Sequence, residues 1–174
     1  KKNNPKKNIV VIDNLKRRGS ELNLLRLKEN KINFIHGDIR NAEDLEISKS
    51  NVSTIVECSA EPSVVAGYND QLSYLFNTNL LGTLNCLNLA KKHKSNFIFL
   101  SSNRIYPFEK INKIKFIESS TRFEMSQKQS LPGVNKFGVD ENFSIHGPKT
   151  FYGTSKLSSE FIIQEYSHAY NLKT

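Results

Sequence analysis

Short apolar runs recur along the chain, and most of them are followed by a segment in which apolar residues have helical spacing. The runs rich in Val, Ile and Phe have the length of buried strands, which predicts strands near residues 8–13, 32–36, 53–59 and 96–101. The segments between and after them predict helices, with Ser20 and Asn41 as caps, over residues 19–30, 41–50, 70–94 and 150–174. Residues 107–148 fit neither pattern, and a connection of that length is typical of a functional or inserted segment.

Alternating strands and helices require crossover connections, which predicts an α/β fold with a parallel sheet and helices on both of its faces. No internal repeat or domain boundary is visible, so we predict one domain over residues 1–174. Ligands of such sheets bind at the carboxyl ends of the strands. The candidate site is therefore formed by the residues at these ends, namely Asp13, Asn14, Asp38, Ser59, Ala60, Ser101 and Ser102.

Composition and charge narrow the classes of partner. The chain has 37% apolar and 24% charged residues, and no apolar run approaches the roughly 20 residues that span a bilayer, so no membrane partner is expected. The net charge of +8 lies in small clusters without interleaved aromatic residues, which favours a solvated surface over a nucleic-acid interface. Cys58 and Cys86 lack metal-ligand spacing, so we predict two reduced core thiols, no metal and a cytoplasmic location.

The segment FYGTSK, near the start of the last predicted helix, combines a phenol with an amine. Tyr152 and Lys156 are four residues apart and therefore share one face of a helix. A nearby ammonium stabilises the phenolate, which makes such a tyrosine a usable general base. This spacing alone also occurs by chance on solvated helix faces. Here a strand that ends in FLSS precedes it by one connection, so we expect Ser102 to reach the same pocket.

Together the segments VVIDNL, HGDIR, NTNLLGTLNCL, FIFLSSNRIYP and FYGTSK resemble the extended short-chain dehydrogenase/reductase family, the nucleotide-sugar epimerases and dehydratases. DNLKRRGSELNL, HGDIR and SSNRIYP look most like the branch of that family named for CDP-paratose 2-epimerase. The resemblance implies a Rossmann-like fold whose first strand, glycine-rich turn and C-terminal substrate region have no counterpart in this sequence. It therefore implies a partial NAD-binding domain over residues 1–174 that is truncated at both ends and inactive by itself.

The resemblance also implies a role for each matching residue. Asp13, with Asn14 beside it, would hydrogen-bond the adenosine ribose, and an acid there favours NAD over NADP, although Arg17 could accept a 2′-phosphate. The other cofactor-binding residues would be Asp38 and Ile39 at the adenine, and Ser59, Ala60, Asn79 and Ser101. Asn79 would also support the catalytic region. Ser102 would hydrogen-bond the reacting oxygen, and Tyr152 would be the base. Lys156 would support Tyr152 and hold the nicotinamide ribose.

The function implied is an NAD-dependent nucleotide-sugar epimerase that oxidises its substrate transiently to a keto sugar. A dehydratase would carry an acidic pair after Ser102, where this chain has Asn103 and Arg104. A 4-epimerase or dehydratase of the same family remains an alternative, as does a catalytically silent nucleotide-binding module. The resemblance implies a nucleotide sugar as the substrate and permits a homodimer in the full-length protein.

Overall fold

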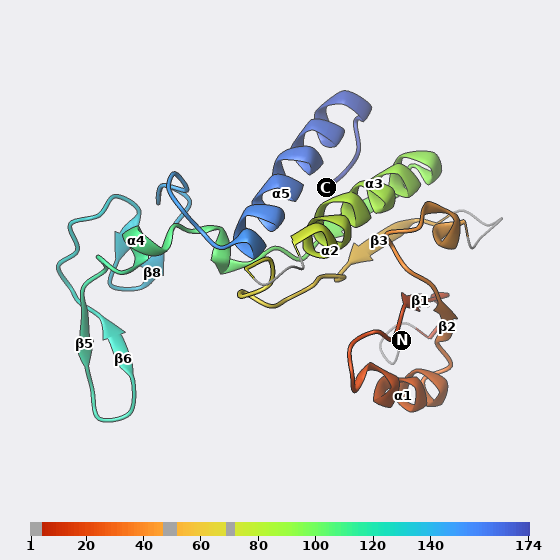
Figure 1. The fold of residues 1–174 in the computed structure, drawn as a ribbon, viewed down its shortest axis with the longest axis horizontal. Coiled ribbons are helices and arrows are strands. Elements are labelled where there is room, and N and C mark those ends of the chain that lie inside the picture. The colour runs from red at the N-terminus through yellow and green to blue at the C-terminus, as the bar shows by residue number, and fades with distance from the viewer. Residues whose placement is uncertain (1–4, 47–51, 69–71) are drawn as a thin grey trace.

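The computed structural model describes residues 5–46, 52–68 and 72–174, and Figure 1 shows their arrangement. The first part of the chain alternates strands with helices or helical turns. Its elements are β1 (Val10–Asp13), η1 (Ser20–Leu22), α1 (Asn23–Glu29), β2 (Asn33–His36), η2 (Ala42–Leu45), β3 (Thr54–Glu57), α2 (Leu72–Phe76), η3 (Asn77–Leu81), α3 (Gly82–His93) and β4 (Asn96–Phe99). All of the predicted strands are therefore present, each somewhat shorter than predicted.

The strands form parallel pairs, as the crossover pattern predicts. β1 pairs with β2 in the register Val11 to Phe34, and β3 pairs with β4 in the register Val56 to Ile98. Within the described residues no ladder joins one pair to the other, so the sheet predicted as continuous is divided in two. Strand patterns in a sequence identify strands but not their neighbours, which is why this division could not be foreseen.

The two faces of the β1–β2 pair are both covered. Val11 and Phe34 line a cavity together with residues of α1, while Ile12, which points the other way, packs against the main core. Figure 1 shows α1 beside β1 and β2, and α3 and α5 (Phe151–Tyr170) together near β3. The core cluster contains residues of η2, α3, β4, α5 and the segment after α5, namely Leu45, Cys86, Leu87, Ala90, Phe97, Ile163 and Leu172.

The apolar run at residues 8–13 predicted a strand covered on both faces, but β3 and β4, which have similar runs, are covered on one face only. Val56 and Ile98 are register partners on one face, and they are 55% and 51% exposed. Phe97 points to the opposite face and is buried against the core. A run of apolar residues cannot tell a strand covered on both faces from one covered on a single face, because either is compatible with the run.

The stretch predicted as irregular contains short regular elements. After η4 (Asn103–Ile105) come α4 (Phe108–Ile111) and two antiparallel hairpins, which Figure 1 shows extending away from α5. Each strand of these hairpins has only two or three residues, too few for an alternating pattern to be recognised. The strands are β5 (Phe116–Glu118), β6 (Phe123–Met125), β7 (Val134–Asn135) and β8 (Gly138–Val139).

Several local predictions need correction. Cys86 is buried as predicted, but Cys58 is exposed, because it follows the buried Glu57 and successive strand side chains point to opposite sides. Ser20 does not cap a helix, since Gly19 precedes the turn that Ser20 begins. Asn41 precedes η2, but its side chain donates to Asp44 instead of capping.

The long helices also differ in detail from the predictions. Residues 70 and 71 of the helix predicted over residues 70–94 lie outside the described residues. The described part is divided into α2 and α3 by η3, a π-helical turn. α5 ends at Tyr170 because Asn171 adopts the left-handed conformation that terminates helices. Within the described ranges, no helix has both the length and the apolar character needed to cross a membrane.

Candidate functional site

A cavity of about 560 Å³ lies at the carboxyl ends of β1, β2 and β3. Ligands of parallel sheets bind in the crevice just outside the carboxyl ends of the strands. The cavity is lined by the strand-end residues predicted from the sequence, namely Asp13, Asn14, Arg17, Asp38, Ile39, Ser59 and Ala60. The remaining predicted residues, Asn79, Ser101, Ser102, Tyr152 and Lys156, lie outside its lining.

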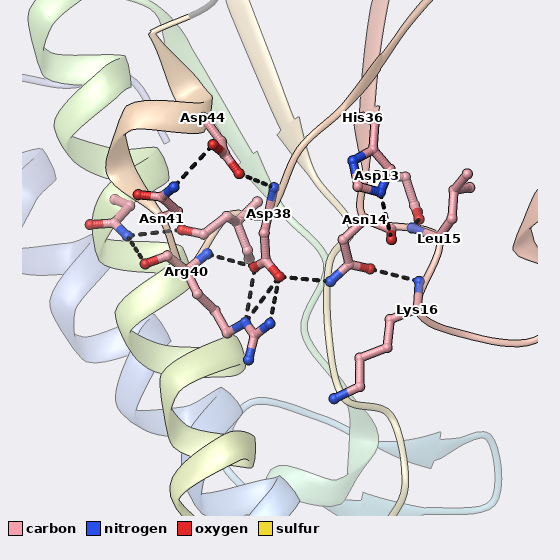
Figure 2. A network of polar contacts seen from close by, with 11 residues as sticks. Asp13, Asn14, Leu15, Lys16, His36, Asp38, Arg40, Asn41 and Asp44 are labelled. Carbon is pink, nitrogen blue, oxygen red and sulfur yellow. Dashed lines mark hydrogen bonds and ion pairs between the residues drawn. The ribbon is translucent and has the colours of Figure 1, made fainter.

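The acidic side of the cavity is held by a polar network that spans the ends of β1 and β2 (Figure 2). Asn14 Nδ2 donates to Asp38 Oδ2 at 2.9 Å, and Arg40 donates to both carboxylate oxygens of Asp38, the shortest contact being 2.6 Å. Asp13 Oδ1 accepts from the backbone N–H of Leu15 at 2.7 Å, which fixes the turn after β1. The network therefore orients both carboxylates at one edge of the cavity.

The Arg40 guanidinium beside Asp38 holds the pKa of that carboxyl well below its usual range, and the hydrogen bond from Asn14 acts in the same direction. Burial opposes this effect but does not outweigh it. Asp38 is therefore an anion throughout the physiological pH range. The pKa of Arg40 is raised by the same hydrogen bond, so the pair remains charged on both sides.

Replacing Arg40 by Gln tests this assignment. Without the guanidinium, the pKa of Asp38 should rise toward the ordinary value, which an NMR titration of the Asp38 carboxyl would follow. Because the folded pKa is depressed, the pair stabilises the fold above the unfolded pKa of about 3.9 and loses this contribution as the pH falls further. The Arg40 side chain is 36% exposed, so the loss at neutral pH should be at most about 1 kcal/mol.

The matched control for this change is Arg122→Gln. Arg122 also pairs with a carboxylate two residues away, Glu124, but its side chain is 75% exposed. Arg122→Gln should leave the NMR titration of Asp38 unchanged. It should also leave unchanged the urea concentration at which half of the protein is unfolded, which measures the stability loss in both variants. A titration of Asp38 that is the same with and without Arg40 would show that the guanidinium does not set the charge of this carboxyl.

Helix α3 and the π-helical turn before it position the far wall of the cavity. Asn85 Nδ2 donates to the backbone oxygen of Ile39 at 2.8 Å, and Gly82 leaves space for the Ile39 side chain, which a Cβ at Gly82 would meet at 2.4 Å. Asn79 is buried in the π-helical turn, and its amide both donates to and accepts from the backbone of Glu61. π-helical turns occur frequently at functional sites.

Asn79 also connects the cavity wall to α5. Its Nδ2 donates to Ser155 Oγ at 3.0 Å, and Ser155 Oγ donates to the backbone oxygen of Tyr152 at 2.8 Å. Ser159 Oγ donates to the backbone oxygen of Asn79 at 2.8 Å. Asn79 therefore fixes the loop after β3 and the first turns of α5 relative to one another, while its place among the cofactor-binding residues stays a prediction.

Tyr152 lies in the first turn of α5, one turn before Lys156. Thr150 caps this helix by accepting from the Gly153 N–H at 3.0 Å, which determines where the helix begins. Lys156 is only 2% exposed, and burial lowers its pKa.

The segment after β4 packs against the start of α5. A Cβ at Gly153 would lie 2.0 Å from the backbone oxygen of Arg104, which shows how closely the two backbones approach. Ser101 Oγ donates to Glu160 of α5. Ser102 Oγ accepts from the Arg104 N–H at 3.1 Å, which leaves its own O–H available as a donor.

Comparison with known proteins gives the context of this arrangement. Residues 2–174 match the model of the NAD dependent epimerase/dehydratase family. The chain belongs to the NAD-dependent epimerase/dehydratase family. It is 29% identical over 173 residues to CDP-paratose 2-epimerase from Salmonella typhi, a match that covers 95% of this chain and 47% of that protein. The chain thus spans about half the length of this curated relative.

Solved structures show the same fold. The UDP-Glc/GlcNAc 4-epimerase of Campylobacter jejuni superposes with a TM-score of 0.68 at 21% identity, covering 96% of this chain and 44% of the other. A dTDP-glucose 4,6-dehydratase of Streptomyces venezuelae, solved with NAD, superposes with a TM-score of 0.69 at 24% identity, covering 95% and 44%. The Rossmann-like α/β fold predicted from the sequence is confirmed.

NAD is the cofactor of this family, and the cavity fits a polar nucleotide. Thr78 lines the cavity, and within the described part of the chain its buried Oγ1 has no hydrogen-bond partner, as expected where a polar ligand would supply one. Asp13 offers a carboxylate suited to the vicinal hydroxyls of a ribose. The donor set and the size of the cavity are thus consistent with the adenosine half of NAD.

The structure adds residues that the sequence reasoning missed. Tyr74 lines the cavity between two cations, with Lys16 Nζ 3.4 Å and the Arg40 guanidinium carbon 4.8 Å from its ring centroid. Cys58, predicted as a core residue, lines the cavity instead. Tyr74 lies in the same helical stretch as Asn79, five residues before it, and this position could have indicated that Tyr74 is near the site. No local pattern indicated that Cys58 lines the cavity.

Proposed function

We propose that the full-length protein is an NAD-dependent nucleotide-sugar epimerase that acts through a keto-sugar intermediate and resembles CDP-paratose 2-epimerase. The observation that carries the proposal is the arrangement of side chains at the start of α5. This helix places Tyr152 and Lys156 one turn apart, packed against the segment that contains Ser102. The similarity to CDP-paratose 2-epimerase supports the choice among the family's substrates.

The cavity residues would hold the cofactor. Asp13 would accept from the hydroxyls of the adenosine ribose, and Asp38 and Ile39 would flank the adenine. Ser59 and Ala60 would contact the cofactor from the end of β3. The carboxylate of Asp13 disfavours a 2′-phosphate, which supports NAD over NADP, while Arg17 in the same cavity makes NADP the necessary comparison.

NAD, when bound, would supply a reversible hydride acceptor, so that the reaction has no net change in oxidation state. Tyr152 would take the proton from a sugar hydroxyl as hydride leaves the carbon that bears it. Ser102 would donate its hydroxyl hydrogen to the same oxygen. Lys156 would favour the phenolate and bind the nicotinamide ribose. When hydride returns to the opposite face of the keto sugar, Tyr152 would give the proton back.

Asn103 and Arg104 support an epimerase over a dehydratase. They follow Ser102 directly and form the turn η4. Elimination of water from a sugar needs an acid and a base beside the reacting carbons, for which an amide and a guanidinium are unsuited. Binding without turnover remains the competing hypothesis, because the cavity alone would serve a nucleotide-binding module.

Calorimetry and turnover of the full-length protein test the proposal. NAD should bind more tightly than NADP, and among CDP-, UDP- and GDP-sugars a CDP-sugar should be converted to its epimer, which NMR of the product would identify. Binding of NAD without conversion of any sugar in the panel would replace the epimerase by the binding module. Predominant conversion of a UDP-sugar at C4 would instead assign a 4-epimerase. The homodimer and the cytoplasmic location stay predictions.

A further inference from the structure

Glu57 is a buried carboxylate beside the site for which the mechanism above has no use. It is the last residue of β3, is 3% exposed, and does not line the cavity. Its Oε2 lies 2.9 Å from Thr83 Oγ1, whose single hydroxyl hydrogen is shared with the backbone oxygen of Asn79 at 2.8 Å. Its buried Oε1 has no hydrogen-bond partner in the described part of the chain. A buried charge is costly unless an opposite charge compensates it, so Glu57 requires an explanation.

Lys156 lies on the same side of the strands as Glu57. Glu57 and Phe99 are register partners in the parallel ladder of β3 and β4, so their side chains point to one face of neighbouring strands. Lys156 Nζ lies over the ring of Phe99, 3.7 Å from its centroid. The ammonium of α5 is therefore above the residue directly beside Glu57, and both charges share one buried region.

Each of the two charged groups favours the charged form of the other. Burial raises the pKa of Glu57 and lowers the pKa of Lys156, and in each case the charge of the other residue opposes this shift. For Lys156, Glu57 is the first opposing charge, ahead of Glu160 and Cys58. Burial raises the pKa of Cys86, which faces Glu57 from α3, to about 12, so that thiol is neutral.

Glu160 is a weaker candidate for the same role. It is only partly buried and accepts a hydrogen bond from Ser101, so its charge is already shared with a donor and with solvent. Glu57 is buried, and its Oε1 is unpaired in the described residues. An interaction between charges is stronger where water is excluded, which favours Glu57 as the partner of Lys156.

We propose that Glu57 is a positioning residue, the buried counter-charge that keeps Lys156 protonated one helical turn from Tyr152. The proposal rests on the proposed function in assigning Lys156 to catalysis. The pairing of the two charges does not depend on that function. Glu57 itself contacts neither substrate nor cofactor, and its effect passes through Lys156.

Competitive acetylation of the full-length protein tests the pairing without any activity assay. Glu57→Gln removes the charge, while its amide oxygen can still accept from Thr83. The pKa of Lys156 should then fall. At a fixed pH below it, the fraction of neutral, reactive amine should rise about tenfold for each unit of that fall, so labelling should increase. Mass spectrometry of the peptide that contains Lys156, over a series of pH values, measures this. Glu57→Asp should largely restore the wild-type labelling profile.

The surface residue Glu46 provides a control of equal charge. It pairs with Lys92, and both side chains are more than half exposed. Glu46→Gln should leave the labelling of Lys156 unchanged. In an active protein, Glu57→Gln should also move the alkaline limb of the turnover profile to lower pH, which Glu46→Gln should not do.

A stability cycle covers the case in which Glu57→Gln folds poorly. Removing one member of a buried pair leaves the other uncompensated, whereas removing both does not. The double variant Glu57→Gln with Lys156→Met should therefore unfold at a higher urea concentration than Glu57→Gln alone.

Additive losses in this cycle, or an unchanged Lys156 labelling profile in Glu57→Gln, would overturn the inference even if the protein proved to be an epimerase. Absence of turnover in wild type would defeat the proposed function while labelling still tested the pair.

Discussion

Tyr152→Phe in the full-length protein is expected to retain NAD binding and to lose turnover by about 10²–10⁴-fold, the usual cost of removing a positioned general base. The phenylalanine ring keeps the packing of tyrosine at the start of α5, so the helix and the cavity should be undisturbed. Only the proton acceptor is removed. Calorimetry with NAD and steady-state turnover of the preferred nucleotide sugar measure the two effects separately.

Tyr68→Phe is the matched control for this experiment. Tyr68 is 59% exposed, and its ring contacts Phe151, the neighbour of Tyr152, at a centroid distance of 5.0 Å. Loss of its hydroxyl should leave both binding and turnover unchanged. If Tyr152→Phe converted the substrate as fast as wild type, Tyr152 would not be the base. If it also lost NAD binding, its role would be structural.

Gly153→Ala is expected to destabilise the protein strongly and to reduce activity as a consequence. The new Cβ would lie 2.0 Å from the backbone oxygen of Arg104 and 2.9 Å from its carbonyl carbon. Alanine favours a helix by about 1 kcal/mol over glycine, but overpacking typically costs about 1–3 kcal/mol. Because a backbone carbonyl cannot rotate away as a side chain can, we expect the clash to win and the loss to reach the upper end of that range.

Gly82→Ala distinguishes this clash from a general effect of alanine. Gly82 is also helical, and its Cβ would meet Ile39, but the atoms concerned are the end of a flexible side chain. Its urea midpoint should therefore fall less than that of Gly153→Ala. A Gly153→Ala protein as stable as wild type would show that the Arg104 segment is not held against α5, and the placement of Ser102 would need revision.

The sequence by itself determined the class of fold and the chemistry of the candidate site. Apolar strand runs separated by helical spacing predict an α/β fold, because these periods follow directly from local backbone geometry. The strand ends Asp13, Asp38 and Ser59 were predicted to converge, and they line one cavity. The spacing of Tyr152 and Lys156 places them on one helix face, which α5 confirms as a helix. The strands and helices need only short-range information, and the convergence of the strand ends follows from the rule that parallel strands present their carboxyl ends on one edge.

The tertiary structure alone decided which elements meet. The division of the sheet into two parallel pairs, the exposed face of β3 and β4, and the hairpins after α4 depend on neighbours distant in sequence. The exposure of Cys58 and the role of Asn79 depend on them as well. The sequence did not distinguish Glu57 from other strand residues. The strand register placed it beside Phe99, and the ammonium of Lys156 lies over the Phe99 ring. Burial and charge pairing are properties of three-dimensional contact, so a pattern along the chain could not reveal them.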